Sequence, residues 1–268
     1  MTLDAVLEAI RAAQPAFAAW GLGFARVLGL LVIVPVSTRI GLRGLLRASV
    51  AGALAVLLLP GLLPAVQADM PGPVRMLVLG TKEGFVGLLV GLLFAVPFWV
   101  AETAGELVDQ QRGSRATAVP DPAGQEESGQ TATLLALTLV TVFLTSGGME
   151  HLLRAVVDSY GVWPVTAGWP AMAADTPEQV LGLMDVVLRA GFLFASPLVG
   201  GMVLAELSLA LVGRFAPQLN VFDLSMTVKG LVYVVALPLY AVVLIGYLRD
   251  GLKPLAGMGE ALRRLGGS

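Results

Sequence analysis

The residues best suited to chemistry in this 268-residue sequence are charged residues inside or beside long apolar stretches. Glu102, Glu106 and Asp109 follow one another at spacings of four and three, which would place all three carboxylates on one face of a helix. Carboxylates this close repel one another unless cations or water neutralise them. The face is therefore either a solvated helix end or the lining of a polar passage.

Three further charges lie in apolar surroundings. Arg26 and Glu206 fall inside apolar runs, and Lys229 opens the last run. An ionisable group in a bilayer is costly and usually faces a charged partner or water. One function open to these intramembrane charges is a polytopic transporter of small solutes or ions that also uses the acidic helix face.

Catalytic chemistry finds little support in the sequence. The lone histidine, His151, stands beside Glu150, and the chain contains no cysteine. A metal site would need two or three further ligands at suitable spacing, so an interfacial, non-catalytic histidine is favoured over an intramembrane enzyme. The sequence also lacks a Gly-Lys dipeptide, a G-x-S-x-G motif and an H-E-x-x-H motif. No catalytic residue, metal or cofactor is predicted.

The elements that would position these residues are long apolar segments. Hydrophobic residues make up 56% of the chain and charged residues only 13%, which is unusual for a soluble domain. A helix needs about 20 residues to cross the hydrocarbon core. Six segments reach or approach that length: 17–36, 48–66, 84–101, 132–149, 190–213 and 230–248. We predict an all-α membrane protein that forms a single membrane domain over residues 1–268.

Shorter polar or amphipathic pieces flank these segments. Residues 1–14 are predicted to form an amphipathic helix and show none of the features of a cleavable signal peptide. Residues 102–131 form a polar loop region. The tail, 249–268, is predicted to be amphipathic and to lie on a surface, because Leu262 and Leu265 follow a helical period with Arg263 on the other side.

Charge and proline indicate that the six segments are not six independent crossings. Lys and Arg divide almost evenly between the two sides that simple crossings would create, whereas ordinary multi-pass proteins show a bias. Proline also lies within five of the six runs, as Pro35, Pro60, Pro97, Pro197 and Pro238. Proline removes a backbone hydrogen bond, and lipid tolerates the resulting break only where protein or water satisfies the freed carbonyl. We expect broken, in places re-entrant hairpins that are buried against partners.

Glycine in the third run predicts close helix packing. Gly80 with Gly84, and Gly87 with Gly91, are GxxxG spacings that allow two helix backbones to approach each other.

Several blocks of the sequence resemble one protein family. They are KEGFVGL (82–88), PFW (97–99), AGELVDQQRG (104–113), DP (121–122), DSY with WP (158–160, 163–164) and RFAPQLNVF (214–222). In wording and spacing they resemble the inner-membrane export-apparatus protein of bacterial type III secretion, called SctT, YscT, SpaR or HrcT in injectisomes and FliR in flagella. The resemblance covers about residues 26–229. The blocks at 109–113 and 214–220 look more like the injectisome branch.

The resemblance implies a subunit of the type III export gate in the bacterial inner membrane, within the secretion-system base. Such a subunit helps to form and close the channel through which unfolded secreted proteins pass. The implied partners are SctR-like and SctS-like subunits in a conical helical hetero-oligomer, with an SctU-like switch protein and an SctV-like export gate beside it. Membrane lipid surrounds this assembly, and no nucleic acid is implied. Helical hairpins wrapped within the cone would account for the balanced charge.

The resemblance also implies roles for particular residues. The family's plug, which projects into the channel, would correspond to the loop from about Gln110 to Pro122. Its residues here are Asp109, Gln110, Gln111, Arg112, Gly113, Ser114, Ala116, Asp121 and Pro122. Glu102 and Glu106 would lie on a polar helix face near the channel.

A signature turn is implied between the last two apolar segments. Its residues are Phe215, Pro217, Gln218 and Asn220. Its side-chain amides are expected to satisfy backbone groups at exposed helix ends. Asp223 and Thr227, just after this turn, depart from the usual family pattern.

Overall fold

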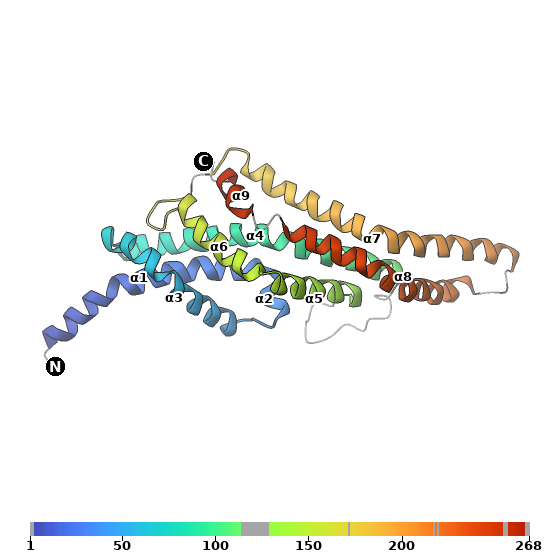
Figure 1. Cartoon of the computed structure of the whole chain (residues 1–268), viewed down its shortest axis with the longest axis horizontal. Coiled ribbons are helices and arrows are strands. Elements are labelled where there is room, and N and C mark those ends of the chain that lie inside the picture. Colours follow the sequence, from blue (N-terminus) through green and yellow to red (C-terminus); the bar gives the residue numbers. More distant parts are fainter. Residues whose placement is uncertain are drawn as a thin grey trace. The chain divides into compact units, whose positions relative to one another are not determined.

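The computed structural model describes residues 3–113, 129–170, 172–216, 218, 220–253 and 257–265, and all regular secondary structure in these ranges is helical (Figure 1). The helices are α1 (Leu3–Ile33), α2 (Pro35–Arg39), α3 (Leu45–Ala68), α4 (Pro73–Arg112), α5 (Gln130–Thr145), α6 (Gly148–Val162), α7 (Thr176–Phe215), α8 (Val221–Leu252) and α9 (Met258–Leu265). The predicted all-α class is confirmed.

Five of the described helices are long and apolar enough to cross a membrane: α1 over Glu8–Ile33, α3, α4, α7 and α8. The segment predicted over 132–149 is different, because α5 ends at Thr145 and α6 begins at Gly148. Gly147, between them, adopts a left-handed conformation with φ of 79°. A sixth span arises only if α5 and α6 together count as one broken span.

Proline interrupts only one of the predicted runs. Pro35 begins α2 directly after the end of α1, with Val34 as the extended N-cap residue. The other four prolines lie inside continuous helices: Pro60 in α3, Pro97 in α4, Pro197 in α7 and Pro238 in α8. The expected breaks are therefore confined to Pro35, and the long helices accommodate the remaining prolines without ending.

The chain folds into two compact units, which are described separately. Unit 1 comprises Met1–Ala95, Gly147–Gln179 and Pro254–Ser268, and unit 2 comprises Val96–Ser146 and Val180–Lys253. Unit 1 thus contains α1, α2, α3, α6, α9 and the first part of α4. Unit 2 contains the rest of α4, α5, most of α7 and α8.

In unit 1, the backbones of α1 and α4 approach each other closely at glycines of both helices. A Cβ atom on Gly87 would overlap a backbone carbonyl of α1, and one on Gly91 would overlap an α1 side chain. The carbonyl oxygen of Gly84 occupies the place of a Cβ on Gly29. The predicted close approach is confirmed at these positions, whereas Gly80 has open space around it.

The tail helix α9 also belongs to unit 1. Leu262 and Leu265 are buried, and Arg263 is exposed, as the helical period of the tail predicts. The carbonyl oxygen of Leu265 accepts hydrogen bonds from the Ala173 N–H at 3.1 Å and the Thr176 hydroxyl at 3.2 Å. These bonds attach α9 to the start of α7.

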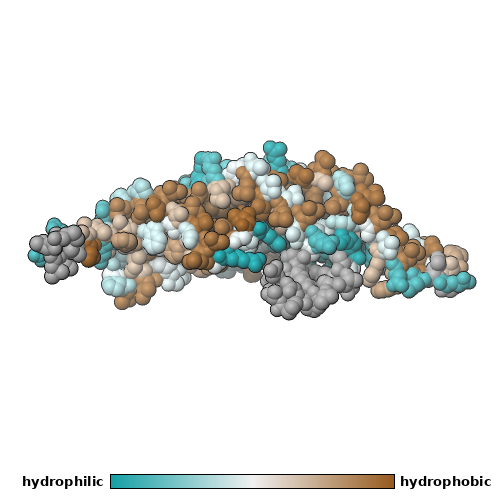
Figure 2. All heavy atoms as spheres, turned by 90° about the horizontal axis from the view of Figure 1, so that it is seen from below, coloured by the Kyte–Doolittle hydropathy of each residue, from teal (hydrophilic) through white to brown (hydrophobic). Residues whose placement is uncertain are grey.

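In unit 2, the second part of α4 packs closely on α5. A Cβ on Gly105 would overlap the backbone at Ala132, and the rings of Phe98 and Phe143 meet edge to face with centroids 5.5 Å apart. By contrast, only 17% and 11% of the apolar windows of α7 and α8 are buried, against 56% in α4. Apolar residues are widely spread over the face shown in Figure 2. Lipid or other protein must cover the exposed faces of α7 and α8.

The α1–α4 approach leads to a first prediction. Gly87→Ala should destabilise the protein by about 1–3 kcal/mol or more, because the added methyl group meets backbone that cannot move independently of its helix. Gly80→Ala, on the same helix but in open space, is the matched control and should be neutral or slightly stabilising. Thermal unfolding of the detergent-solubilised chain measures both, and equal effects would contradict the close approach.

Candidate functional site

The acidic face of α4 lies just before the predicted plug loop, and its carboxylates also bind residues that follow the loop. The polar loop predicted over 102–131 is shorter than expected, because residues 102–112, including the first residues of the predicted plug, belong to α4 and residues 130 and 131 belong to α5. Gly113 and Gly129 are the described residues that flank the remaining loop. Glu106 Oε1 accepts a hydrogen bond from the backbone N–H of Gly129 at 3.1 Å. One carboxylate of α4 therefore holds the end of the loop that leads into α5. Ser114, Ala116, Asp121 and Pro122 lie outside the described residues.

Asp109 caps the N-terminus of α5. Its Oδ2 accepts the N–H groups of Thr131 at 2.7 Å and Ala132 at 3.2 Å, and its Oδ1 accepts the Thr131 hydroxyl at 2.6 Å. The first N–H groups of a helix have no partner within the helix, and the helix dipole favours negative charge there. The Asp109 side chain, which is fully buried, is thus satisfied by the helix that follows the loop.

Gly129 and Arg112 complete this junction. A Cβ at Gly129 would overlap the Asp109 carboxylate, so only glycine allows the contact. Arg112 Nη2 donates to Gln130 Oε1 at 3.1 Å, and its guanidinium lies 4.3 Å from the ring centroid of Tyr233 in α8. The Tyr233 hydroxyl is also hydrogen bonded to the Thr131 hydroxyl at 3.0 Å. We call Glu106, Asp109, Arg112, Gly129, Thr131 and Tyr233 the loop anchor.

The loop anchor changes the interpretation of one of the three carboxylates. Asp109 is buried and bound by backbone N–H groups at the start of α5, so it is not part of a solvated helix end. Glu106 is half-buried and accepts one hydrogen bond from Gly129, and its place on a polar face near the channel stays a prediction. Glu102, one turn earlier, is half-buried and also has a partner. The available signal was the Gly-Gln-Thr sequence at 129–131, a helix start that needed an acceptor.

Two of the predicted intramembrane charges meet in unit 2. Lys229 Nζ lies 3.5 Å from Glu206 Oε2, and Gln111 Nε2 donates to the same oxygen at 3.2 Å. The Lys229 side chain is 12% exposed and that of Glu206 is 48% exposed. This long, half-exposed ion pair joins α7, α8 and the end of α4.

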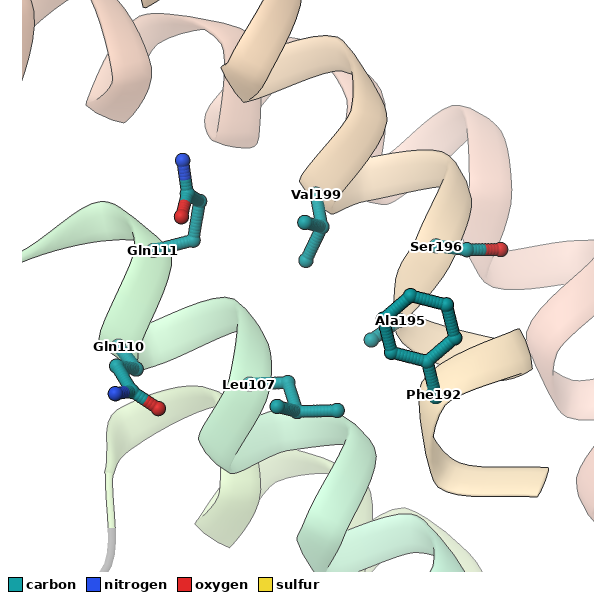
Figure 3. A pocket seen from close by; sticks show the side chains of 7 residues that line it. All are labelled: Leu107, Gln110, Gln111, Phe192, Ala195, Ser196 and Val199. Carbon is teal, nitrogen blue, oxygen red and sulfur yellow. The ribbon is translucent and has the colours of Figure 1, made fainter. Parts of the chain in front are cut away.

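A pocket of about 170 Å³ lies beside this pair, between α4 and α7 in unit 2. Its lining residues are Leu107, Gln110 and Gln111 from α4 and Phe192, Ala195, Ser196 and Val199 from α7. In Figure 3, Leu107 and Val199 point into the space between the two helices. The pocket therefore combines amide groups with an apolar wall next to the loop anchor.

Arg26 belongs to a different site, in unit 1. Its Nε and Nη2 donate to the Glu83 carboxylate at 2.6 and 3.0 Å, its Nη1 donates to Ser159 Oγ at 2.8 Å, and its Nη2 also donates to the Trp163 carbonyl at 2.9 Å. The guanidinium lies 3.6 Å from the ring centroid of Tyr160. Arg26 and Glu83 are almost completely buried.

Lys82 adds a second cation to this site. Its Nζ lies 2.7 Å from Glu83 Oε1 and donates to the carbonyl groups of Pro164, Val165 and Ala167 at 2.8, 3.0 and 3.3 Å. Sequence reasoning did not single out Lys82 and Glu83 as site residues. A usable signal existed, because two adjacent opposite charges interrupt an apolar stretch and a lone buried arginine requires a carboxylate.

A third cation completes the row of carbonyl contacts. Arg75 Nη2 donates to the Thr166 carbonyl at 3.0 Å, so each carbonyl from 163 to 167 accepts a hydrogen bond from a basic side chain. Both Arg75 Nη atoms also bind the Asp69 carboxylate, at 2.8 and 2.6 Å, and these bonds hold the pKa of Asp69 below its ordinary value. Arg26 uses its own donors on Glu83, Ser159 and the Trp163 carbonyl, so it is not available to bind a transported solute.

The signature turn lies between α7 and α8. Phe215 is 87% exposed and Gln218 is exposed, while Pro217 lies outside the described residues. Asn220 is the N-cap residue of α8, and its amide donates to the Asp223 side chain instead of capping the helix backbone. The structure therefore assigns the Asn220 amide to Asp223, one of the positions that depart from the family pattern.

Metal chemistry has no candidate among the described residues. In those ranges, no group of three or more His, Asp or Glu side chains is arranged to hold a metal ion. His151 is half-buried on α6.

The charge cluster of unit 1 leads to a second prediction. Glu83→Gln should destabilise the protein by about 3–5 kcal/mol, because it leaves two buried cations without a carboxylate. Arg26→Met should cost less, because Lys82 still pairs with Glu83. Unfolding of the detergent-solubilised variants in increasing denaturant gives the comparison. Equal losses, or a larger loss for Arg26→Met, would contradict the central role of Glu83.

Comparison with known proteins gives a consistent result. The family described as "Bacterial export proteins, family 1" matches residues 17–254. The chain is 35% identical to Yop proteins translocation protein T of Yersinia pestis over 216 residues, which cover 80% of this chain and 82% of that protein. It is 31% identical to surface presentation of antigens protein SpaR of Salmonella typhimurium over 222 residues, 82% and 81% of the two chains.

A flagellar relative is more distant. Flagellar biosynthetic protein FliR of Escherichia coli is 25% identical over 167 residues, 61% of this chain and 63% of the relative. The injectisome proteins are therefore the more similar of these relatives, as the wording of the sequence blocks indicates. The chain belongs to family 1 of the bacterial export proteins, and is a multi-pass inner-membrane component of a type III secretion export apparatus.

Proposed function

We propose that this protein forms part of the wall of the type III export channel and helps to keep it closed when no substrate passes. The observation that carries the proposal is the loop anchor. Asp109 and Glu106 of α4 bind the start of α5, and Arg112 binds Gln130 and Tyr233. The polar loop of residues 113–129 thus begins and ends at a fixed junction between α4, α5 and α8.

In this proposal the channel plug extends from the end of α4, at about Gln110, to Pro122 in the polar loop. The small residues Gly113, Ser114, Ala116 and Ala118 give a compact strip that fits a narrow pore. The hydrogen bonds of Glu106 and Asp109 to the start of α5 join α4 and α5 directly, so in this proposal the loop is displaced while the two helices stay joined. Closure then depends on the loop, and the position of the loop depends on the anchor.

We further propose that the SctR-like and SctS-like subunits cover the exposed faces of α7 and α8. Support comes from the small buried share of these apolar helices and from the half-exposed carboxylate of Glu206, which is unsuited to lipid. SctU-like and SctV-like proteins would be further neighbours. The subunit has no catalysis of its own in this scheme, and energy for export comes from other components.

The solute-transporter alternative is not supported. Of the residues that it requires, Arg26, Asp109 and Glu106 bind other parts of this chain. The relatives named above are secretion and flagellar proteins.

A third prediction concerns the loop anchor. Asp109→Ala removes the cap of α5, which is worth about 1 kcal/mol, and should make membranes that contain the assembled complex leaky to small molecules. Asp109→Asn keeps an acceptor oxygen and should leak less. Glu150→Gln is the control, because it neutralises an exposed carboxylate in a surface pair with Arg154. Dye efflux from vesicles measures the leak, and tight vesicles with Asp109→Ala would contradict an anchoring role.

A fourth prediction tests the assignment as a whole. Co-expression with SctR-like and SctS-like subunits should yield a stable complex on purification, and deletion of residues 113–118 should leave that complex intact but leaky. Unchanged leakage after the deletion would count against closure by the loop. A self-contained monomer or homodimer that transports a solute would overturn the proposal entirely.

A further inference from the structure

One edge of α7 carries a regular row of side chains, which we call the α7 seam. Its members follow one another at alternating spacings of four and three: Phe192, Ser196, Val199, Val203 and Glu206. They are half-buried or exposed, whereas Ala195, Leu198 and Met202 behind them are buried. Such spacing aligns side chains along one line of a helix and is typical of a surface on which a second helix packs.

The pocket of about 170 Å³ lies at one end of the α7 seam. Phe192, Ser196 and Val199 form its α7 wall, and residues of α4 form the other wall (Figure 3). A cavity of about 150 Å³ takes up a molecule of benzene, so this pocket has room for one large apolar side chain. Phe192 is 60% exposed, so the pocket is reached from the surface of unit 2.

A carboxylate lies at the other end of the α7 seam. Glu206 Oε2 accepts a hydrogen bond from Gln111 at 3.2 Å and lies 3.5 Å from Lys229 Nζ. Among the residues that the structure describes, none donates a hydrogen bond to Glu206 Oε1. Because the side chain is 48% exposed, this second oxygen is open to a donor from outside the chain.

The exposed residues on both sides of Glu206 are apolar. Leu204 is 67% exposed, Leu207 58% and Leu211 61%. The same medium must therefore cover apolar side chains and a carboxylate within three turns of one helix. Lipid acyl chains cover leucine but donate no hydrogen bond, whereas a protein helix can present apolar and charged side chains together. A helix satisfies both requirements.

The charge of Glu206 favours a basic side chain as the missing donor. Close hydrogen bonds between ionised groups measure about 2.7–2.9 Å, and the contact with Lys229 is longer, at 3.5 Å. The carboxylate of Glu83 in unit 1 accepts close contacts from two cations, Arg26 at 2.6 Å and Lys82 at 2.7 Å. Glu206 has one distant cation and an open oxygen.

We propose that a helix of a partner subunit docks along the α7 seam, with one apolar side chain in the pocket and one basic side chain on Glu206 Oε1. Val199 and Glu206 are seven residues apart, about 10 Å along the helix axis. A helix packed nearly parallel or antiparallel to α7 therefore carries its two contact residues about seven positions apart. The inference rests on the proposed function, because it takes the partner from the export assembly, and it adds the chemistry of the contact.

The first test measures assembly in competition. Equal amounts of wild-type and variant chains are co-expressed with limiting SctR-like and SctS-like subunits, and mass spectrometry gives their ratio in the purified complex. Glu206→Gln should be incorporated about 10-fold less than the wild type, because it removes one partner of a covered charge pair. Ser196→Trp should show a similar loss, because its ring fills the pocket and excludes the partner's side chain.

A matched control separates the contact from general effects. Asp185→Asn removes a carboxylate from an exposed position of α7 outside the seam, and it should be incorporated as well as the wild type. The free variant chains in detergent should unfold at the wild-type temperature, which shows that the loss does not arise from misfolding.

A second measurement identifies the partner helix without weakening the contact. Because the chain has no cysteine, Val203→Cys places a single photoactivatable benzophenone on the seam between Val199 and Glu206. In the purified complex, mass spectrometry of the cross-linked peptide should identify a helix of an SctR-like or SctS-like subunit. We expect that helix to carry Arg or Lys and a large apolar residue seven positions apart.

Several results would overturn the docking. Equal incorporation of Glu206→Gln and Ser196→Trp into a complex that does form would do so and leave the proposed function standing. Cross-links to detergent or lipid alone, or to a helix without a basic residue, would do the same. Failure of the wild-type chain to form any complex would overturn the docking and the proposed function together.

Discussion

The carboxylate of Glu83, buried between Arg26 and Lys82, sets the arrangement of unit 1. A buried charge costs several kcal/mol unless its partners lie at hydrogen-bond distance, and here one partner comes from a different helix. α1 and α4 can hold Arg26 and Glu83 that close because the neighbouring glycines carry no side chain into the interface. The two cations also donate to the carbonyl groups of residues 163, 164, 165 and 167. The turn after α6 thus takes its shape from charges on α1 and α4.

Unit 2 satisfies a buried carboxylate in another way. Asp109 is as deeply buried as Glu83, and its two oxygens accept hydrogen bonds from two N–H groups and a hydroxyl group at the start of α5. A helix N-terminus carries only a partial positive charge. Its groups are fixed in space, so the carboxylate determines where α5 begins. The loop between α4 and α5 must return to the Asp109 carboxylate, so the fixed position of the N–H groups matters more than the strength of each hydrogen bond.

The sequence predicted what depends on local pattern. The length of the apolar runs predicted helices that are able to cross a membrane, and the glycine spacing predicted the close helix approach at Gly84, Gly87 and Gly91. The need of Arg26 for a partner also followed from its apolar surroundings, but the identity of that partner did not. Glu83 lies 57 positions away along the chain, and only the packing of α1 on α4 brings the two together. Likewise, the spacing of Glu106 and Asp109 predicted that they share one helix face. Their hydrogen-bond partners at 129–132 lie after the polar loop, and that spacing could not identify them.

The two units differ in how completely their charges are satisfied within the chain. In unit 1, the buried cluster around Glu83 has its ligands in place. In unit 2, Glu206 lies on an apolar helix with 48% of its side chain exposed and a cation 3.5 Å away. Lipid cannot solvate that carboxylate, so the monomer carries a cost that an added hydrogen-bond donor or water would remove. An apolar helix with such a residue is therefore better suited to an assembly than to lipid. In unit 1, two buried cations share the one carboxylate of Glu83, and carbonyl oxygens of residues 163, 164, 165 and 167 accept the remaining hydrogen bonds of these cations.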